Sequence, residues 1–373
     1  MIDFSRFAFE QTRDSKPKVA VTEERARITW VDYARGVGIF LVVLGHVLRG
    51  LRSSEIIGGG SAFRFVDSWI YAFHMPLFFL LSGLFAGRRV GRSGGTFLRE
   101  IFGSIAYPYL VWSALQTLMQ FALSRYTSNR VNLSELAGIL VYPVMQFWFL
   151  YVLLLIYLGY YVLRRIGLGP LGTFGVFAAF WATQGWVGLG GWWPINLSRI
   201  HGIYFAMGAL VTRYGWTGRV GQAPSATLAL FSALGYGAVA AAVARPPGDS
   251  LDSVSGLTIA LCGITASVAL AVLLSRMRGV DFVRVMGVYS LEIFVAHTIV
   301  SAGLRIALVK GFSIHNTAAH VAIGTIGGIA LPELLSRLCR RYHAEFLFRL
   351  PARTEPPENS RSAIDSTSQQ ADR

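Results

Sequence analysis

Two histidines near the N-terminus lie in apolar stretches, where an ionisable side chain is unusual. His46 is in the segment WVDYARGVGIFLVVLGHVLRG, which also contains Asp32 and Arg35 near its start. His74 opens the stretch HMPLFFLLSG, and Asp67 comes shortly before it. Histidine has an ordinary pKa close to neutrality, so these residues suit general acid–base catalysis.

A second set of polar residues could bind substrates. Glu292 and His297 are five residues apart in the apolar stretch GVYSLEIFVAHT. A sugar hydroxyl is a poor nucleophile at neutral pH and needs a base within hydrogen-bond reach. A thioester donor such as acyl-CoA carries phosphates, which arginines bind. The combination is typical of acyl transfer, with donor contacts expected among Arg88, Arg89, Arg92 and Arg99.

The composition places these residues in a membrane protein. Of the 373 residues, 53% are hydrophobic and only 14% are charged, whereas about a quarter of the residues of a soluble domain are charged. The 40 glycines and 25 phenylalanines are typical of closely packed membrane helices. Ionisable groups inside membrane spans cost several kcal/mol unless they are paired or face water, which makes each one a functional candidate.

An all-α bundle with about ten transmembrane helices is expected, because apolar runs of roughly 20 residues recur along the chain. The short loops after the second, fourth, sixth and eighth runs carry most of the arginines, which predicts that both termini are cytoplasmic. Residues 1–28 are expected to form a polar tail, 29–340 the membrane domain, and 341–373 a largely disordered tail. The expected spans are 31–51, 69–87, 101–123, 138–163, 171–190, 200–213, 226–244, 256–275, 285–308 and 318–338.

The net charge of +14 does not indicate a nucleic-acid partner, because the basic residues are scattered singly or in pairs between apolar runs. Cys262 and Cys339 have neither disulfide-framework nor metal-site spacing. The antiparallel order of the first two spans predicts that His46 and His74 lie at similar depth. Asp67 is expected to approach one of these two imidazoles.

The most specific motifs resemble those of the acyltransferase-3 family of membrane acyltransferases. The segment VDYARGVGIFLVVLGHV keeps Arg35, a ten-residue gap and His46, and FHMPLFFLLSG follows at 73–83. Weaker similarities are YPYLVW at 107–112, FWFLYVLLL at 147–155 and YSLEIFVAH at 289–297. The resemblance covers roughly 28–340 and is strongest to the branch of fucose 4-O-acetylases and exopolysaccharide O-acyltransferases.

The resemblance implies a ten-helix bundle that takes acyl-CoA from the cytoplasmic side and a glycan or lipid-linked sugar as acceptor. His46 matches the histidine thought essential in the family, and Arg35 matches the basic residue of the same motif. The basic run before the third span is less dense here than in the family, RRVGRSGGTFLRE. Which arginine would meet CoA therefore stays open.

The resulting hypothesis is a multi-pass O-acyltransferase of the inner (cytoplasmic) membrane. It would use acetyl-CoA or succinyl-CoA as donor substrate, without a permanently bound cofactor or metal, and acylate a surface or exported polysaccharide or its lipid-linked precursor. A transporter or flippase of a sugar or lipid-linked glycan is the alternative. The expected catalytic residues are His46, His74, Arg35 and Asp32, and the expected substrate-binding residues are Asp67, Glu292, His297, Arg89, Arg92 and Arg99.

Several of these residues also have a purely structural interpretation. Asp32 and Arg35 are three residues apart and could form an ion pair on one helix face. Glu292 and His297 could be polar contacts that join helices within the membrane. The arginines after the second span could act only as topology signals. The sequence does not decide among these roles, nor does it fix the acyl group, the acceptor or the oligomeric state.

Overall fold

The structure is a computed structural model that describes residues 28–122, 134–184, 186–188, 190–244 and 253–350. Every regular element in these residues is a helix, as expected. Most of the expected N-terminal tail and the end of the C-terminal tail lie outside the described residues.

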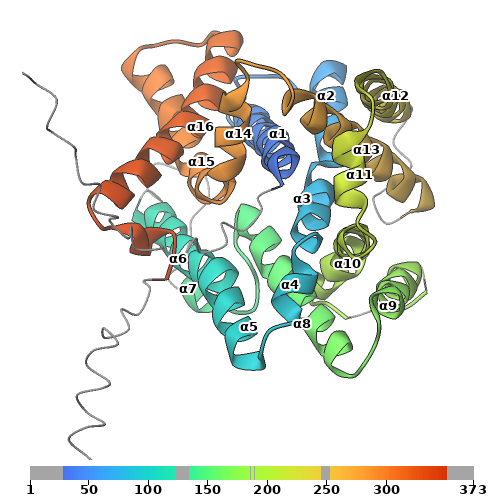
Figure 1. Ribbon diagram of the computed structural model, residues 1–373. Coiled ribbons are helices and arrows are strands. Elements are labelled where there is room, and N and C mark those ends of the chain that lie inside the picture. Colours follow the sequence, from blue (N-terminus) through green and yellow to red (C-terminus); the bar gives the residue numbers. More distant parts are fainter. Residues whose placement is uncertain (1–27, 123–133, 185, 189, 245–252, 351–373) are drawn as a thin grey trace, which may run out of the picture.

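The helix that carries His46 is surrounded by other helices. This helix, α1 (Thr29–Ser53), lies among differently coloured neighbours in Figure 1 and buries most of its length. Its position follows from its sequence, which is apolar on all sides except at a few polar residues. The helices packed against it are α2 (Ser61–Tyr71), α3 (His74–Gly83), α13 (Val254–Leu274), α14 (Asp281–Val288), α15 (Ser290–Ile306) and α16 (Thr317–Arg341).

The remaining helices cover the bundle. Helix α10 packs on α3, α8 and α9, and α12 packs on α13. The short helices α4, α5, α7 and α11 follow or precede the long ones. The bounds of this group are α4 (Ala86–Val90), α5 (Gly94–Ile101), α6 (Tyr107–Ala122), α7 (Ser134–Gly138), α8 (Trp148–Arg165), α9 (Pro170–Ala182), α10 (Trp193–Arg213), α11 (Trp216–Gln222) and α12 (Ser225–Val243).

Seven helical segments of the described chain are long and apolar enough to cross a membrane, compared with about ten expected spans. Each expected span nevertheless contains a helix. Helix α9 has only 13 residues, and α10 carries Asn196, Arg199 and His201 near its start, which lowers its hydropathy. Helix α6 is described over 16 residues. These three helices account for the difference.

The second expected span is divided into α2 and α3. The break at Ala72 and Phe73 precedes His74, and Pro76 lies in the first turn of α3. Proline is tolerated there because the first backbone N–H groups of a helix have no intrahelical acceptor. The break therefore makes His74 the first residue of a new helix.

Glycines permit two very close helix crossings. A Cβ atom added to Gly287 of α14 would lie 1.7 Å from the Asp32 carbonyl oxygen of α1, and one on Gly36 would lie 2.0 Å from the Val283 oxygen. Helices α3 and α10 cross in the same reciprocal way at Gly83 and Gly208. Small residues at both sides of a crossing are typical of packed membrane helices.

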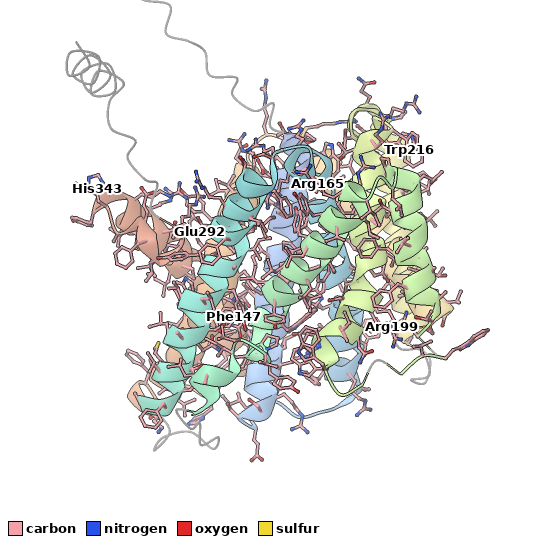
Figure 2. The ribbon with its side chains drawn as sticks, turned by 90° about the horizontal axis from the view of Figure 1, so that it is seen from below. Phe147, Arg165, Arg199, Trp216, Glu292 and His343 are labelled. Carbon is pink, nitrogen blue, oxygen red and sulfur yellow. The ribbon has the colours of Figure 1, made fainter. Side chains whose placement is uncertain are left out.

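The two ends of the bundle can be identified by labelled residues. Figure 2 shows Arg165 and Trp216 near one end and Arg199 towards the opposite end. Trp30 Nε1 donates a hydrogen bond to the Thr217 carbonyl at 3.2 Å, so the start of α1 lies at the end that holds Trp216. The cytoplasmic location of this end, hereafter the Thr29 end, stays a prediction.

The membrane domain extends past the expected boundary at residue 340. Tyr107 Oη donates to the Phe346 carbonyl at 2.7 Å and Trp112 Nε1 to the Leu347 carbonyl at 2.8 Å. Phe348 is buried against the Trp112 ring. Residues up to 350 are therefore part of the packed bundle, because aromatic side chains hold them against α6.

Candidate active site

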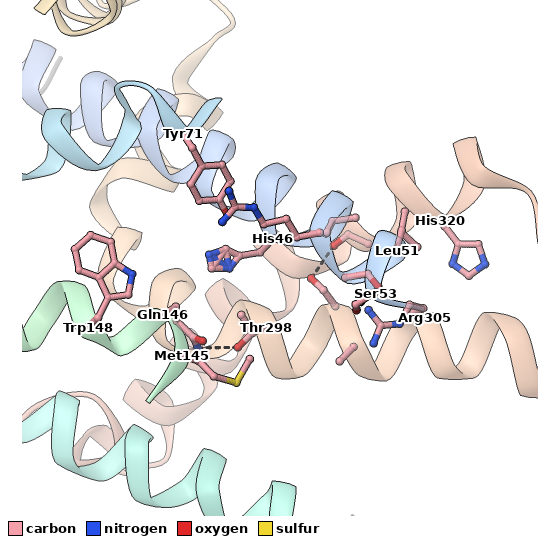
Figure 3. Close-up of a pocket in the computed structure, with 16 residues that line it drawn as sticks. His46, Leu51, Ser53, Tyr71, Met145, Gln146, Trp148, Thr298, Arg305 and His320 are labelled. Atoms are coloured by element: carbon pink, nitrogen blue, oxygen red, sulfur yellow. Dashed lines mark hydrogen bonds between the residues drawn. The ribbon is translucent and has the colours of Figure 1, made fainter. Parts of the chain in front are cut away.

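A cavity of about 520 Å³ lies near the Ser53 end of α1. Its walls come from α1, α2, α15, α16 and the residues that lead into α8 (Figure 3). Arg49 and Ser53 line it and are exposed, so the cavity opens at this end of the bundle. The polar side chains that line it include His46, Gln146, Thr298, Ser301 and Arg305.

The His46 imidazole faces this cavity from the middle of three ring systems. Tyr71 stacks against it with ring centroids 6.4 Å apart, and His297 meets it edge to face at 5.0 Å. In Figure 3 the imidazole lies between Tyr71 on one side and Gln146 and Thr298 on the other. His46 is only partly buried, whereas His297 is fully buried. His46 can therefore contact a ligand in the cavity, while His297 packs against the side of the His46 ring that faces away from the cavity.

Asp67 contacts Arg49, and not an imidazole as the sequence analysis expected. Its two carboxylate oxygens accept hydrogen bonds from Arg49 Nε at 2.6 Å and Nη2 at 3.0 Å. The same guanidinium lies over the Tyr71 ring, with its Cζ 3.1 Å from the ring centroid. Arg49 lies about one turn after His46 on α1. It can therefore bind the Asp67 carboxylate, which was expected to contact the imidazole of His46 or His74. Asp67 thus acts on the site through Arg49 and Tyr71.

The hydrogen bonds of His297 define its tautomer. Nδ1 lies 3.0 Å from the Ile293 carbonyl and 2.8 Å from the Phe294 carbonyl. Because carbonyl oxygens only accept, Nδ1 carries the proton and Nε2 presents a lone pair. Nε2 is buried and has no hydrogen-bond partner among the described residues. A buried acceptor left in this state next to His46 is a functional candidate.

His74 is close to the cavity but does not line it. Its Nδ1 donates to the Ile70 carbonyl at 2.8 Å, and its ring meets Tyr71 edge to face at 4.6 Å. Tyr71 therefore contacts both His46 and His74. The two histidines therefore lie on either side of one tyrosine, and their similar depth in the membrane stays a prediction.

An amide–hydroxyl network forms another wall of the cavity. Gln146 Nε2 donates to Thr298 Oγ1 at 2.7 Å and to Gln116 Oε1 at 2.9 Å. Thr298 Oγ1 also donates to Gln116 Oε1 at 3.3 Å. These residues join α6, the short turn Met145–Phe147 before α8, and α15 at the level of His46. They were not among the predicted site residues, although glutamines inside apolar spans are themselves a signal of buried polar contacts.

Arg35 and Asp32 lie at the other end of α1. Arg35 precedes His46 by 11 residues, which is about 16 Å along a helix axis. Its guanidinium lies 5.3 Å from the Phe85 ring, and Arg89 lies 5.3 Å from the Tyr157 ring. Phe85 precedes Arg89 by four residues, so the two guanidinium groups lie in the same region. Arg35 and Arg89 thus gather near the Thr29 end, away from His46.

The other expected binding residues have separate contacts. Arg92 pairs with Glu100, and Arg99 is exposed on α5. Glu292 is almost fully buried at the Thr29 end of α15, where it pairs with Arg340 at 3.3 Å and Arg349 at 3.6 Å. These contacts place the carboxylate in an ion pair that links three segments, in agreement with the structural interpretation of Glu292.

The arrangement around His46 is suited to proton transfer at a ligand. An imidazole lines an open cavity, a second imidazole with a free lone pair lies behind it, and hydroxyl and amide groups lie opposite. The basic residues near Tyr157 form a separate region that suits phosphate or other anions.

Comparison with known proteins agrees with this geometry. The family model described as an acyltransferase domain, of the acyltransferase 3 type, matches residues 28–337. No curated protein and no solved structure gave a significant match. The matched region includes the cavity, all of α1 and the arginines near Tyr157.

Proposed function

Because the chain belongs to the acyltransferase 3 family, we propose that it transfers an acyl group from acyl-CoA to a hydroxyl of a carbohydrate. The chain is a membrane acyltransferase by its family and its apolar helices. The proposed acceptor is a surface or exported polysaccharide or its lipid-linked precursor. The proposed location is the cytoplasmic membrane, with acetyl-CoA or succinyl-CoA as the donor.

In the proposed reaction, His46 acts as the general base. Its imidazole removes the proton from the acceptor hydroxyl while the hydroxyl oxygen attacks the thioester carbonyl carbon. The carbon–sulfur bond then breaks, and the CoA sulfur leaves as a thiolate that takes the proton back from His46. The products are the O-acyl glycan and free CoA, so no oxidant or reductant is needed.

His297 would position His46 for this step. Its unpaired Nε2 can accept a hydrogen bond from one nitrogen of His46, which leaves the other nitrogen of His46 as the base. The pairing would also stabilise the imidazolium that forms when His46 takes the proton. Tyr71, held by Arg49 and His74, would keep the His46 ring in place.

The donor phosphates would bind near Arg35 and Arg89. Arg35 lies about 16 Å from His46 along the axis of α1, so only the extended arm of CoA would reach the imidazole. Arg35 would then contact donor charge at a distance from the reacting carbonyl. This role agrees with the position of Arg35, whereas direct contact with the oxyanion would require the side chain to span that distance.

The observation that carries the proposal is that His46 lines an open cavity whose largely apolar wall also carries polar side chains. A histidine sealed among apolar side chains could not meet a hydroxyl. The unpaired Nε2 of His297 beside it supports the same interpretation.

The test uses purified protein in proteoliposomes with labelled acetyl-CoA or succinyl-CoA and glycans extracted from the producing cells. We expect His46→Ala to lower acyl incorporation by about 10²- to 10⁴-fold, the usual contribution of a general base. His315→Ala is the matched control, because His315 is exposed at the same end and does not line the cavity. Unchanged incorporation by a correctly inserted His46→Ala protein would refute the role of His46.

The same preparation tests the alternative of a transporter or flippase. Such a protein would move the glycan across the bilayer without consuming CoA. Release of free CoA in proportion to acylated glycan supports the enzyme, and glycan movement without CoA release supports the transporter.

A further inference from the structure

The cavity beside His46 has an unbalanced positive charge. Among the residues that the structure describes, its ionised lining residues are Arg49 and Arg305, and no aspartate or glutamate lines it. The charge of Arg49 is neutralised by Asp67, through two hydrogen bonds to the carboxylate. Arg305 makes no hydrogen bond or ion pair with any described residue. A half-buried guanidinium in a membrane span is costly unless an anion or water satisfies it.

The position of Arg305 relates it directly to His46. A Cβ atom added to Gly50 would lie 2.5 Å from Arg305 Nη1, so the absence of a side chain at Gly50 lets the guanidinium rest against α1. Gly50 is four residues after His46, which is about 6 Å along the helix axis. In Figure 3, Arg305 lies beside Ser53 on the His320 side of the cavity, away from Trp148.

The wall between these two residues carries hydroxyl groups that can contact the hydroxyls of a sugar. Thr298, Ser301 and Arg305 are spaced by three and four residues on α15, so they share one helix face, and all three line the cavity. A ligand that contacts His46 with one hydroxyl would therefore meet Thr298 and Ser301 next and the guanidinium last.

We propose that the acceptor is an anionic glycan whose carboxylate or phosphate binds Arg305 while a nearby hydroxyl meets His46. This inference rests on the proposed acyltransferase function and specifies its acceptor. The roughly one-turn separation places the anionic group on the acylated sugar or on its immediate neighbour. A guanidinium presents paired N–H groups that match either a carboxylate or a phosphate. Two sources share this chemistry: a uronic-acid carboxylate and the diphosphate of a lipid-linked sugar.

The test compares three forms of the glycan extracted from producing cells that lack this protein. One form is untreated, one has its carboxylates reduced to alcohols, and one has its sugar–diphosphate bonds cleaved by mild acid. Acyl incorporation is measured for the wild type, Arg305→Gln, Arg305→Lys and the control Arg52→Gln. Arg52 is exposed at the same end of α1 and does not line the cavity.

The wild type is expected to acylate the untreated glycan and to lose most activity with one of the two treated forms, which identifies the anion. Arg305→Gln is expected to raise the acceptor KM by about 10- to 100-fold, as loss of a charged hydrogen bond would, and to leave the acyl-CoA KM unchanged. The Arg305→Gln variant should acylate the charged and the neutralised glycans at similar rates. Arg305→Lys should recover part of the affinity, and Arg52→Gln should behave as wild type.

Three results would overturn the inference: equal wild-type activity on all three forms, an unchanged acceptor KM in Arg305→Gln, or an increase in the acyl-CoA KM alone. The last would make Arg305 a donor contact. If Arg305→Gln is poorly folded, Arg305→Lys and the wild-type comparison of the three glycans still decide the question. Failure of the proposed function is distinct, because the wild type would then acylate none of the glycans.

Discussion

At the residue scale, the pair formed by His46 and His297 makes a prediction that separates positioning from substrate binding. If His297 is replaced by asparagine, the side-chain amide lies close to the position of Nδ1. If it is replaced by glutamine, the amide lies closer to the position of Nε2. We therefore expect His297→Asn to lower kcat by about 10- to 100-fold, because a hydrogen bond to a charged group contributes about 1.5–3 kcal/mol. His297→Gln, which can offer an acceptor near Nε2, should recover part of the rate.

Initial rates at varied acyl-CoA and acceptor concentrations are the measurement for this pair. Both KM values should stay close to those of the wild type, since His297 is behind His46 and does not line the cavity. An acceptor KM that rises while kcat holds would instead make His297 a substrate-binding residue, as the sequence analysis expected.

The residues of the site were predictable to different degrees. His46 was predictable because an ionisable side chain in an apolar run is costly unless it has a function or a polar partner, and because its sequence motif is specific. Arg49 and Tyr71 were missed, although each is close in sequence to a predicted residue. An arginine near the end of a span is normally an interfacial anchor. Only the folded arrangement shows that Arg49 lies over Tyr71 and is held by Asp67.

At the scale of elements, the crossing of α3 and α10 sets the position of the helix that begins with His74. A Cβ atom on Gly208 would lie 2.1 Å from the Leu80 carbonyl oxygen, which belongs to the backbone and cannot rotate away. Alanine usually stabilises a helix by about 1 kcal/mol relative to glycine. At Gly208 we expect the opposite sign, with Gly208→Ala destabilising by about 1–3 kcal/mol through overpacking.

Gly159→Ala is the matched control, because no atom lies within 4 Å of a Cβ added at that position of α8. Thermal unfolding in detergent, followed by size-exclusion chromatography, should show a lower midpoint for Gly208→Ala and no decrease for Gly159→Ala. Equal midpoints for the two variants would mean that α3 and α10 are not held as closely as described.

The helices were predictable from hydrophobic runs, but their lengths and breaks were less so. All ten expected spans contain helices, yet only seven helical segments within the described parts of the chain meet the length and hydropathy of a span. The division at Ala72 and Phe73 arises from local backbone geometry before Pro76, which an apolar run does not reveal. The glycine content predicted closely packed helices in general. It did not predict which helices cross, because composition does not show which helices are neighbours in the fold.

At the scale of the whole molecule, Glu292 links the Thr29 end of α15 to α16 and to the packed C-terminal segment. Its carboxylate is 2% exposed and pairs with Arg340 and Arg349. The same helix carries His297, Thr298 and Arg305 further along, so the ion pairs fix the helix that forms one wall of the site. Removing one partner of a buried ion pair is strongly destabilising, because the remaining charge is left uncompensated.

We therefore predict that Glu292→Gln lowers both stability and activity. Because Arg340 and Arg349 remain partly in solvent, the loss should be about 1–3 kcal/mol, less than for a fully buried pair. Glu333→Gln is the control, since Glu333 pairs with Arg337 one turn away on the surface of α16, and a surface pair contributes about 0–1 kcal/mol. Chemical denaturation and acyl incorporation would be measured on both variants. If Glu292→Gln were as stable as Glu333→Gln but inactive, the carboxylate would have to act on a substrate directly, and the ion pairs would not be its main role.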